Sequence, residues 1–497
     1  MCLFVFVFVA WALTFTSVTG TRDVTMKLSQ DALNSAGSVY LSAGKLTHTG
    51  TLPDNTTTAV LHKLIPKAYE LCPDCPISFT VFATQPPRAT INSATGATLS
   101  VNGAMLNLTA ASTTTPKVNE LMVLGFNASC GLNFSAVSHK SGYFITADIT
   151  VLQLHLVVES SNVGILPNAA IALLDPLVDA FLKDVAIPAF NKEFPGFPLP
   201  SVPTFTISDL AITTNDGYIG VGLDITAAIS RSPSVLQHEK SKIERKLISP
   251  RDHHLPPGFS GPGAVISVGG QALDKVLKSL IPKIVSKVNG LVIPAMSGKA
   301  SGIDYEIGSI TLGGFKIGSS AIQFDAGKGL SVSLGNLGLN IPSTSFKIKK
   351  KVLFAKISCS GHFSGSLDQT NVGIDINITA TEPQGNPKIT PVSTWNWGSL
   401  GVSVKLNNVF CKIIKSVASW FLGNINHKIE DVIKQMVPSV VNNLINVEGN
   451  DILSSLVLNK KIDNNAEVSF YLTSNPTSAN DALSVNLSGE FIPVPKT

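Results

Sequence analysis

Two long apolar stripes at helical spacing constrain this chain more than any other feature of its sequence. One runs from Cys411 to about Val447, with apolar residues every three or four positions, which is the period of an amphipathic helix. The other, Asn168–Phe194, contains Pro176 and Pro188, and each proline would kink a helix because it lacks an amide donor. Strand-like segments follow both stripes. The repetition predicts two similar halves that pack helices against a sheet, which suits a container for apolar molecules better than a catalyst.

Composition divides the 497 residues into a leader, two domains and a linker. The length is sufficient for two domains of about 200 residues each. Residues 231–263 are rich in charged residues, proline and glycine, which predicts a solvated linker between domains at 21–230 and 264–497. The second domain has more basic than acidic residues and the first has the reverse, so the second is the better partner for anionic surfaces.

Both domains show the order strand, helix, meandering sheet, long helix and closing strands. In the first domain the opening strand and helix lie within residues 23–46, and the closing strands at 204–212 and 218–225. In the second domain the expected helix before the sheet spans residues 271–291. The strands expected there are 264–268, 302–312, 315–324, 330–339, 344–349, 353–363, 372–381, 468–472 and 483–491.

The beginning of the chain predicts secretion. The apolar run from Cys2 to Phe15 is too short to span a bilayer, and small residues follow it up to Gly20, so residues 1–20 read as a signal peptide. A retained anchor is the alternative. Asn-x-Ser/Thr sites agree with an extracellular glycoprotein. These sites are Asn55, Asn107, Asn127, Asn133, Asn377 and Asn486.

Few cysteines remain after removal of the leader: Cys72, Cys75, Cys130, Cys359 and Cys411. In an oxidising compartment they allow two bridges and leave one thiol over. We expect a structural bridge among Cys72, Cys75 and Cys130; a redox Cys-x-x-Cys motif is the weaker alternative. No second cysteine or histidine pair completes a zinc site.

The sequence lacks the motifs of a catalyst. It contains no Gly-x-Ser-x-Gly, no His-Glu-x-x-His and no phosphate loop, so we expect no enzyme activity, no metal and no cofactor. We also expect no nucleic-acid partner, because the basic residues are not interleaved with aromatic ones.

Several stretches resemble the family of bactericidal/permeability-increasing protein, lipopolysaccharide-binding protein and plasma lipid-transfer proteins. Residues 264–491 resemble its amino-terminal domain, and residues 23–226 resemble its carboxy-terminal domain. The order of the two is therefore swapped, as a circular permutation, a segment of tandem copies or a misjoined gene model would leave it. The stretches that carry the resemblance are GNPKIT at 385–390, INHKI at 425–429, LSGEF at 487–491, LSQDALNSAG at 28–37 and PAFNKEFPGFPLP at 188–200.

The resemblance implies an α+β fold shaped as an elongated boomerang. Two barrel domains, each a twisted antiparallel sheet with long amphipathic helices, would be joined by a central sheet, and a phospholipid would lie under the helices of each. The alternative is that side chains fill these spaces. The residues expected to contact acyl chains are Leu273, Leu277, Leu280, Ile284, Phe421, Ile425, Ile429 and Ile433 in the second domain, and Leu174, Leu177, Phe181 and Val185 in the first.

The resemblance also bears on the remaining cysteines. The family's amino-terminal domain bridges a strand to its long helix, but the matching positions look like Pro391 and Pro438 here. Cys359 and Cys411 would connect a strand to the head of the same helix, and we expect them to form a relocated bridge worth about 2–4 kcal/mol.

The densest cationic run, Phe346–Lys356, falls where the family has a hairpin at a basic tip. Such lysines would contact anionic headgroups; an ordinary solvated hairpin is the alternative. The lysines concerned are Lys347, Lys349, Lys350, Lys351 and Lys356.

The favoured function is a secreted lipid-binding or lipid-transfer protein whose partner is phospholipid or another acyl lipid. One alternative is an innate-immune, antimicrobial protein that binds lipopolysaccharide and perturbs bacterial membranes. Another is a structural or interaction protein with filled pockets.

Overall fold

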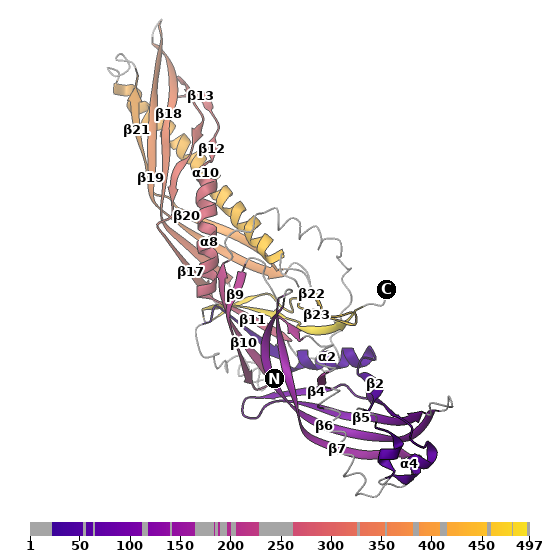
Figure 1. Ribbon diagram of the computed structural model, residues 1–497. Helices are drawn as coiled ribbons and strands as arrows, with labels where there is room; N and C mark the ends of the chain where they lie inside the picture. Colours follow the sequence, from indigo (N-terminus) through magenta and orange to yellow (C-terminus); the bar gives the residue numbers. More distant parts are fainter. Residues whose placement is uncertain are drawn as a thin grey trace, which may run out of the picture.

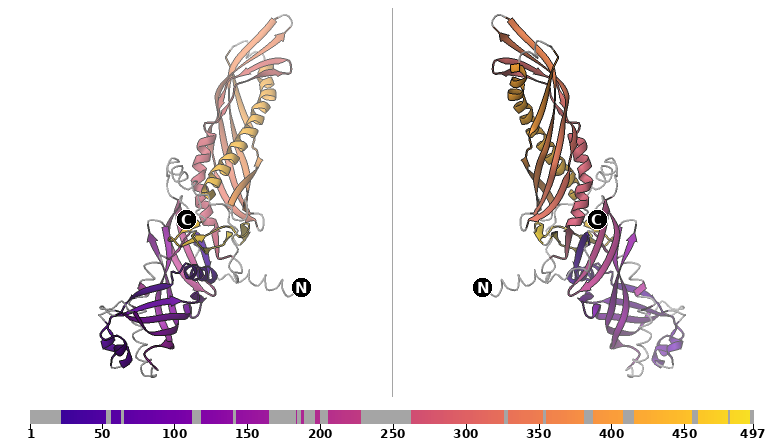
Figure 2. Two further views of the ribbon diagram at one scale, coloured as in Figure 1. Left: turned by 90° about the vertical axis from the view of Figure 1, so that its right-hand side faces the viewer. Right: turned by 90° about the vertical axis from the view of Figure 1, so that its left-hand side faces the viewer.

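A computed structural model shows an elongated molecule whose two halves extend in opposite directions from a shared centre (Figures 1 and 2). The leader, the first-domain helix expected at 168–194 and the linker expected at 231–263 lie wholly or almost entirely outside the described residues. The structure describes residues 22–52, 56–62, 65–111, 118–139, 142–164, 183, 187–188, 196–199, 205–227, 262–325, 329–352, 355–380, 387–407, 415–454, 459–479 and 481–494.

A six-stranded antiparallel sheet forms the centre and takes three strands from each half. Its order is β24-β25-β11-β1-β10-β9. The first strands of the two halves, β1 and β11, lie side by side, with Met26 opposite Ile266. The halves therefore meet with approximate twofold symmetry, and the expected central sheet is confirmed. The strands are β1 (Val24–Ser29), β9 (Phe205–Asn215), β10 (Tyr218–Ala227), β11 (Ala264–Gly269), β24 (Thr477–Ala479) and β25 (Ala482–Leu487).

Each of these first strands leads directly into a helix, α2 (Gln30–Ser42) or α8 (Gly270–Val288). Ser29 caps α2, because its hydroxyl accepts a hydrogen bond from the Ala32 N–H at 3.2 Å and so satisfies a free donor of the first turn. The strand–helix order predicted for the start of each half is confirmed.

The first half continues as a seven-stranded antiparallel sheet with two short helices at its far end. Along β5 the buried residues alternate with half-buried ones from Ala104 to Ala110, so one face of the sheet covers an apolar core. The elements are β2 (Thr47–Thr51), α3 (Thr58–Leu61), α4 (Pro66–Leu71), β3 (Ile77–Ala83), β4 (Arg88–Asn92), β5 (Gly96–Ala111), β6 (Val118–His139), β7 (Gly142–Ser161) and β8 (Phe197–Pro198).

The second half contains an eight-stranded sheet covered by α8 and by α10 (Lys415–Ser454). The helices predicted at 271–291 and from Cys411 are thus confirmed, with shifted ends. The strands are β12 (Val292–Ile293), β13 (Met296–Ala300), β14 (Ile303–Ile307), β15 (Ile310–Thr311), β16 (Gly313–Lys316), β17 (Ser319–Asp325), β18 (Gly329–Val352), β19 (Ala355–Ala380), β20 (Pro387–Asn396) and β21 (Leu400–Leu406), of which β12 and β15 form a separate pair.

The long hairpin of β18 and β19 differs from the prediction. Each of these stretches was expected to hold two strands, but the structure has one continuous strand in each. The register shifts between Leu334 and Leu337, and again between Ile341 and Thr344, near the expected break. The residues between the expected strands are accommodated as β-bulges, which bend a strand without ending it.

One row of residues at four-residue spacing forms the buried side of α10. Four residues turn an α-helix by 400°, so the buried side advances by about 40° at each step and by about 200° along the row. Such a helix cannot lie flat on a plane, and it follows a twisted sheet instead. The row is Ile425, Ile429, Ile433, Val437, Val441 and Ile445, each at most 8% exposed.

A small sheet near the end of the chain packs against α2 of the first half. It consists of β22 (Asn459–Lys461), β23 (Ala466–Ser469) and β26 (Glu490–Pro493). The Phe491 N–H donates to the Ser35 hydroxyl of α2 at 2.9 Å. Phe197 of the first half contacts Phe491 edge-on, with ring centroids 5.7 Å apart. Both halves therefore contribute to one apolar core at their junction.

Candidate functional site

The residues expected to contact acyl chains fall into three groups. Those in the second-half core, at most 7% exposed, are Leu277, Ile284, Ile425, Ile429 and Ile433. Two are half-buried, Leu273 and Leu280. The side chain of Phe421 and all of the first-half residues, Leu174, Leu177, Phe181 and Val185, lie outside the described residues. The first group packs within the protein core, and its contact with acyl chains stays a prediction.

Two rows of half-buried apolar side chains flank this core on α8 and α10. We call the two rows together the α8–α10 seam. On α8, successive positions along one side are Leu273, Val276, Leu280, Lys283 and Lys287. On α10, residues spaced by four are Val432, Met436, Val440, Leu444 and Glu448. Each row is apolar along most of its length and charged at one end.

An ion pair joins the charged ends of the two rows. The Lys283 ammonium donates to the Glu448 carboxylate at 2.5 Å. At 100° per residue, Lys283 lies within about 60° of Leu280 around α8, and Glu448 lies about 40° from Leu444 around α10. α8 begins at the central sheet and α10 ends beside the small sheet at the junction, so the two helices are antiparallel. From this contact the apolar part of the α8 row therefore extends toward the central sheet, and that of the α10 row extends away from it. Figures 1 and 2 show α8 and α10 running beside each other along the second half.

The opposite side of α10 is tied to the edge strand β20. The Asn450 side chain accepts from the Ile389 N–H at 2.8 Å and donates to the Ile389 carbonyl at 3.1 Å. At the neighbouring position, a Cβ on Gly449 would lie 2.0 Å from the Ile389 side chain, so glycine permits this close approach. Asn450 lies about 200° around the helix from Glu448. The contact with β20 is therefore on the side of α10 away from the seam.

The far end of α8 is tied in the same manner. The Asn289 side chain accepts from the Phe315 N–H at 2.6 Å and donates to the Phe315 carbonyl at 3.4 Å. Asn289 follows the last turn of α8. Its side-chain amide forms both hydrogen bonds with the Phe315 backbone that a neighbouring strand would otherwise form. The contact fixes the end of the helix against the sheet.

The cationic run lies at the end of the β18–β19 hairpin, at the far tip of the second half (Figure 1). Lys347, Lys350 and Lys351 are exposed. Lys349 instead pairs with Glu306 of β14 at 2.8 Å, and this hydrogen bond raises the pKa of Lys349 and lowers that of Glu306. The side chain of Lys356 lies outside the described residues. Three lysines of the run are thus free to approach an anionic surface.

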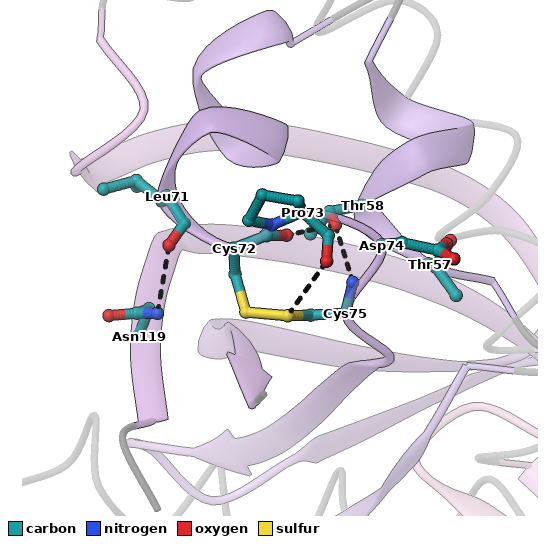
Figure 3. The surroundings of a disulfide bond; sticks show 8 residues. All are labelled: Thr57, Thr58, Leu71, Cys72, Pro73, Asp74, Cys75 and Asn119. Atoms are coloured by element: carbon teal, nitrogen blue, oxygen red, sulfur yellow. Dashed lines mark hydrogen bonds between the residues drawn. A yellow bond between two sulfur atoms is a disulfide. The ribbon is translucent and has the colours of Figure 1, made fainter. Parts of the chain in front are cut away.

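The cysteines of the first half pair locally. Cys72 and Cys75 form a disulfide that closes the loop after α4 (Figure 3). The Thr58 hydroxyl supports the loop, donating to the Cys72 carbonyl and accepting from the Cys75 N–H at 3.0 Å. Asn119 of β6 holds the same end of the loop, because it donates to the Leu71 carbonyl.

Cys130 is a free, buried thiol on the same strand as Asn119. At about 3.3 Å per residue it lies roughly 36 Å along β6 from the disulfide, too far to exchange with it. Cys359 is disulfide-bonded, but its partner and Cys411 lie outside the described residues. The relocated bridge therefore stays a prediction.

The expected glycosylation sites differ in access. Asn127, Asn133 and Asn377 are exposed on strands. Asn107 and Asn486 are half-buried, and their amides donate to Glu120 and Ser474. Asn55 lies outside the described residues. The first three are the better acceptors, because an attached sugar requires a free amide nitrogen.

Comparison with known proteins connects this architecture to one family. Residues 9–227 match the model of the LBP / BPI / CETP family, C-terminal domain. This stretch is therefore similar to the family's C-terminal domain. Curated relatives of the chain include the lipopolysaccharide-binding protein of Bos taurus, 22% identical, with 47% of each chain covered. The bactericidal permeability-increasing protein of Sebastes schlegelii is 24% identical, with 47% of this chain and 48% of the relative covered.

A third curated relative, the human phospholipid transfer protein, is 19% identical over 47% of this chain and 45% of its own length. The chain thus spans about half the length of the curated relatives it matches. Among solved structures, the crystal structure of lipopolysaccharide binding protein covers 96% of this chain and 100% of its own, with 10% identity and a TM-score of 0.32. The α+β class and the two curled antiparallel sheets are confirmed by the fold itself.

Two further features of the described residues bear on the site. None of their helices has the length and hydropathy that a bilayer crossing requires. In the same part of the chain, no group of three or more His, Cys, Asp or Glu side chains is arranged to hold a metal ion.

Sequence reasoning included two members of the α8 row, Leu273 and Leu280, but missed the α10 row. The prediction chose Ile425, Ile429 and Ile433, whereas Met436 and Val440 were seen as part of the same stripe. One signal in the sequence distinguishes the half-buried row from the buried one. Residues spaced by four from Met436 lead through Leu444 to the charged Glu448, which indicates a side of the helix that reaches solvent.

Proposed function

We propose that this chain is a secreted, non-enzymatic lipid-binding protein that carries phospholipid. The acyl chains of the phospholipid would lie along the α8–α10 seam, with a second lipid in the first half. The observation that carries the proposal is the row of half-buried apolar side chains on each of the two helices that cover the sheet. Covering apolar surface is worth about 25 cal/mol per Å², so a hydrocarbon chain would bind there favourably. The names of the curated relatives support the same ligand class.

The protein purified from a secreting eukaryotic cell should carry phospholipid. Native mass spectrometry should show an added mass that extraction identifies as phospholipid, and the protein should move fluorescent phosphatidylcholine between vesicles. Met436→Glu should reduce the bound lipid several-fold, since a carboxylate in the seam would lose its hydration against a hydrocarbon chain. Gln435→Glu, at the neighbouring exposed position, is the matched control. Lipid-free protein that transfers nothing would favour the structural alternative with filled spaces.

A second candidate function is binding of lipopolysaccharide at the hairpin tip. The three exposed lysines at 347, 350 and 351 favour it. Each lysine near an anionic surface is worth about 1 kcal/mol, so replacing all three by alanine should weaken binding to lipopolysaccharide roughly a hundredfold. Replacing the exposed Lys45, Lys67 and Lys388 instead is the control. Equal losses in both triple variants would assign the binding to general charge rather than to the tip.

We also propose that the two domain types occur in swapped order, with domains at 21–230 and 264–497. The match of the C-terminal-domain model to residues 9–227 supports this order. The central sheet also supports it, because each half contributes its own first strand and closing hairpin. A sheet built in this symmetric way is compatible with either order of the halves.

A further inference from the structure

A buried carboxyl group lies at the junction of the two halves, away from the seam. Glu490 begins β26 and is 2% exposed. It precedes Phe491, whose N–H donates to the Ser35 hydroxyl of α2, so it borders the contact between the small sheet and the first half. A carboxylate at such a position is costly to ionise, because burial removes its hydration.

The hydrogen bonds around this side chain do not compensate for its burial. Among the described residues its Oε1 atom has no hydrogen-bond partner, and the carboxyl group bonds with the Tyr471 hydroxyl. Ser469, which pairs with Glu490 across the sheet, donates its hydroxyl to Asn459 at 2.8 Å. The Ser488 hydroxyl donates to the Ser469 carbonyl at 2.7 Å. The hydrogens of these two hydroxyls are therefore not available to the carboxyl group.

No cation of the described residues pairs with Glu490. In the small sheet, Lys461 of β22 donates to Asn464 instead, and Glu467 of β23 carries a like charge. Lys460 lies on the opposite face of that sheet, over the Phe144 ring of the first half. The charged residue of α2 is Asp31, in its first turn, and the neighbouring strands β11 and β25 consist of uncharged residues.

These surroundings favour the protonated form of the side chain. Burial raises the pKa of Glu490 above its ordinary value, and the hydrogen bond from Tyr471 opposes this rise by a smaller amount. A carboxyl group whose pKa is raised by folding binds its proton more tightly in the folded chain. Its contribution to stability is complete below the pKa of the unfolded chain, about 4.3, and is lost as the pH rises through the folded pKa.

We propose that Glu490 is a pH-sensitive latch between the small sheet and α2, closed while its carboxyl group is protonated and opened by its ionisation. An ionised carboxylate requires water, and water reaches it when β26 separates from α2. That separation breaks the hydrogen bond between Phe491 and Ser35 and loosens the junction of the two halves. The latch acts at the junction alone, whether or not the chain binds lipid.

Hydrogen–deuterium exchange of the whole chain tests the latch. It is measured by mass spectrometry at pH 5 and pH 8 and corrected for the intrinsic effect of pH on exchange. Peptides that cover β26 and α2 should be about threefold or more less protected at pH 8, since one pKa unit of differential binding is a factor of ten in the opening equilibrium. Glu490→Gln keeps the size of the side chain without its charge and should be equally protected at both pH values. The same pH dependence in this variant and in the unmodified protein would overturn the inference.

Two further variants identify the titrating group. Tyr471→Phe removes the hydrogen bond that lowers the pKa of Glu490, so protection should be lost at a higher pH than in the unmodified protein. An unchanged midpoint would assign the titration to another group and overturn the latch, and this readout decides the test where Glu490→Gln does not fold. Glu467→Gln, on the neighbouring strand and half-buried, is the matched control and should leave the pH dependence as it is. Its loss in that variant would place the switch at Glu467 instead.

Discussion

Replacing Ile429 by alanine is expected to lower the free energy of unfolding by about 2–5 kcal/mol, the range for deleting buried branched side chains from a packed core. Ile429 is 0% exposed and lies in the middle of the buried row of α10. Its neighbours in that row, Ile425 and Ile433, are held by the same core, so the space left by the deletion cannot close without moving the helix. Thermal unfolding of delipidated protein measures the loss.

Val440→Ala is the matched variant on the same helix. Val440 belongs to the half-buried row of the seam, so its truncation should cost less stability and reduce the amount of bound lipid. Ile429→Ala should show the reverse pattern, a large loss of stability with lipid still present in the folded fraction. A small stability loss accompanied by lost lipid in Ile429→Ala would place the acyl chain against the buried row, as the sequence first suggested.

The helices could be predicted because their period is local. The apolar residues between Cys411 and Val447 recur at helical spacing whatever they pack against, and α10 follows from them. Which row is core and which borders the seam could not be predicted. Ile433 and Met436 are three residues apart and about 60° apart around the helix, and only the position of the sheet distinguishes them. Only the structure shows that Lys283 at the end of the α8 row contacts Glu448 at the end of the α10 row.

Long-range contacts account for most of what the sequence did not reveal. The Phe491 N–H meets the Ser35 hydroxyl across 456 positions, and no local pattern records that contact. Lys349 was grouped with its neighbours as a headgroup ligand, but β14 brings Glu306 beside it. In β18, separate strands were expected at 330–339 and 344–349, whereas pairing with β19 on both sides of Pro342 keeps the strand continuous. Local sequence patterns predicted which segments form helices or strands. The lengths of the strands, and which side chains are paired within the protein, depend on partners that are distant in the sequence.

Lys275→Met should destabilise the junction of the two halves by about 1–3 kcal/mol, because it removes the charged partner of a buried carboxylate from a side chain that is itself 43% exposed. Lys275 of α8 reaches across to the first half, where it donates to the Asp23 carboxylate and, at 3.1 Å, to the Ile225 carbonyl. Asp23 is 2% exposed, and its other recorded contact through the same oxygen is the Ile225 N–H at 2.9 Å. Methionine keeps the length of the side chain but leaves this carboxylate buried without a cation.

A second substitution separates a charge effect from a packing effect. Asp23→Asn removes the buried negative charge that Lys275 contacts, so Lys275→Met should cost clearly less stability in the Asp23→Asn background than in the unmodified protein. Lys278→Met is the control, since Lys278 pairs with Asp274 within one exposed turn and such pairs contribute at most about 0.5 kcal/mol. A deficit that is the same in both backgrounds, or equal in the Lys275 and Lys278 variants, would mean that α8 is held to the first half by packing alone.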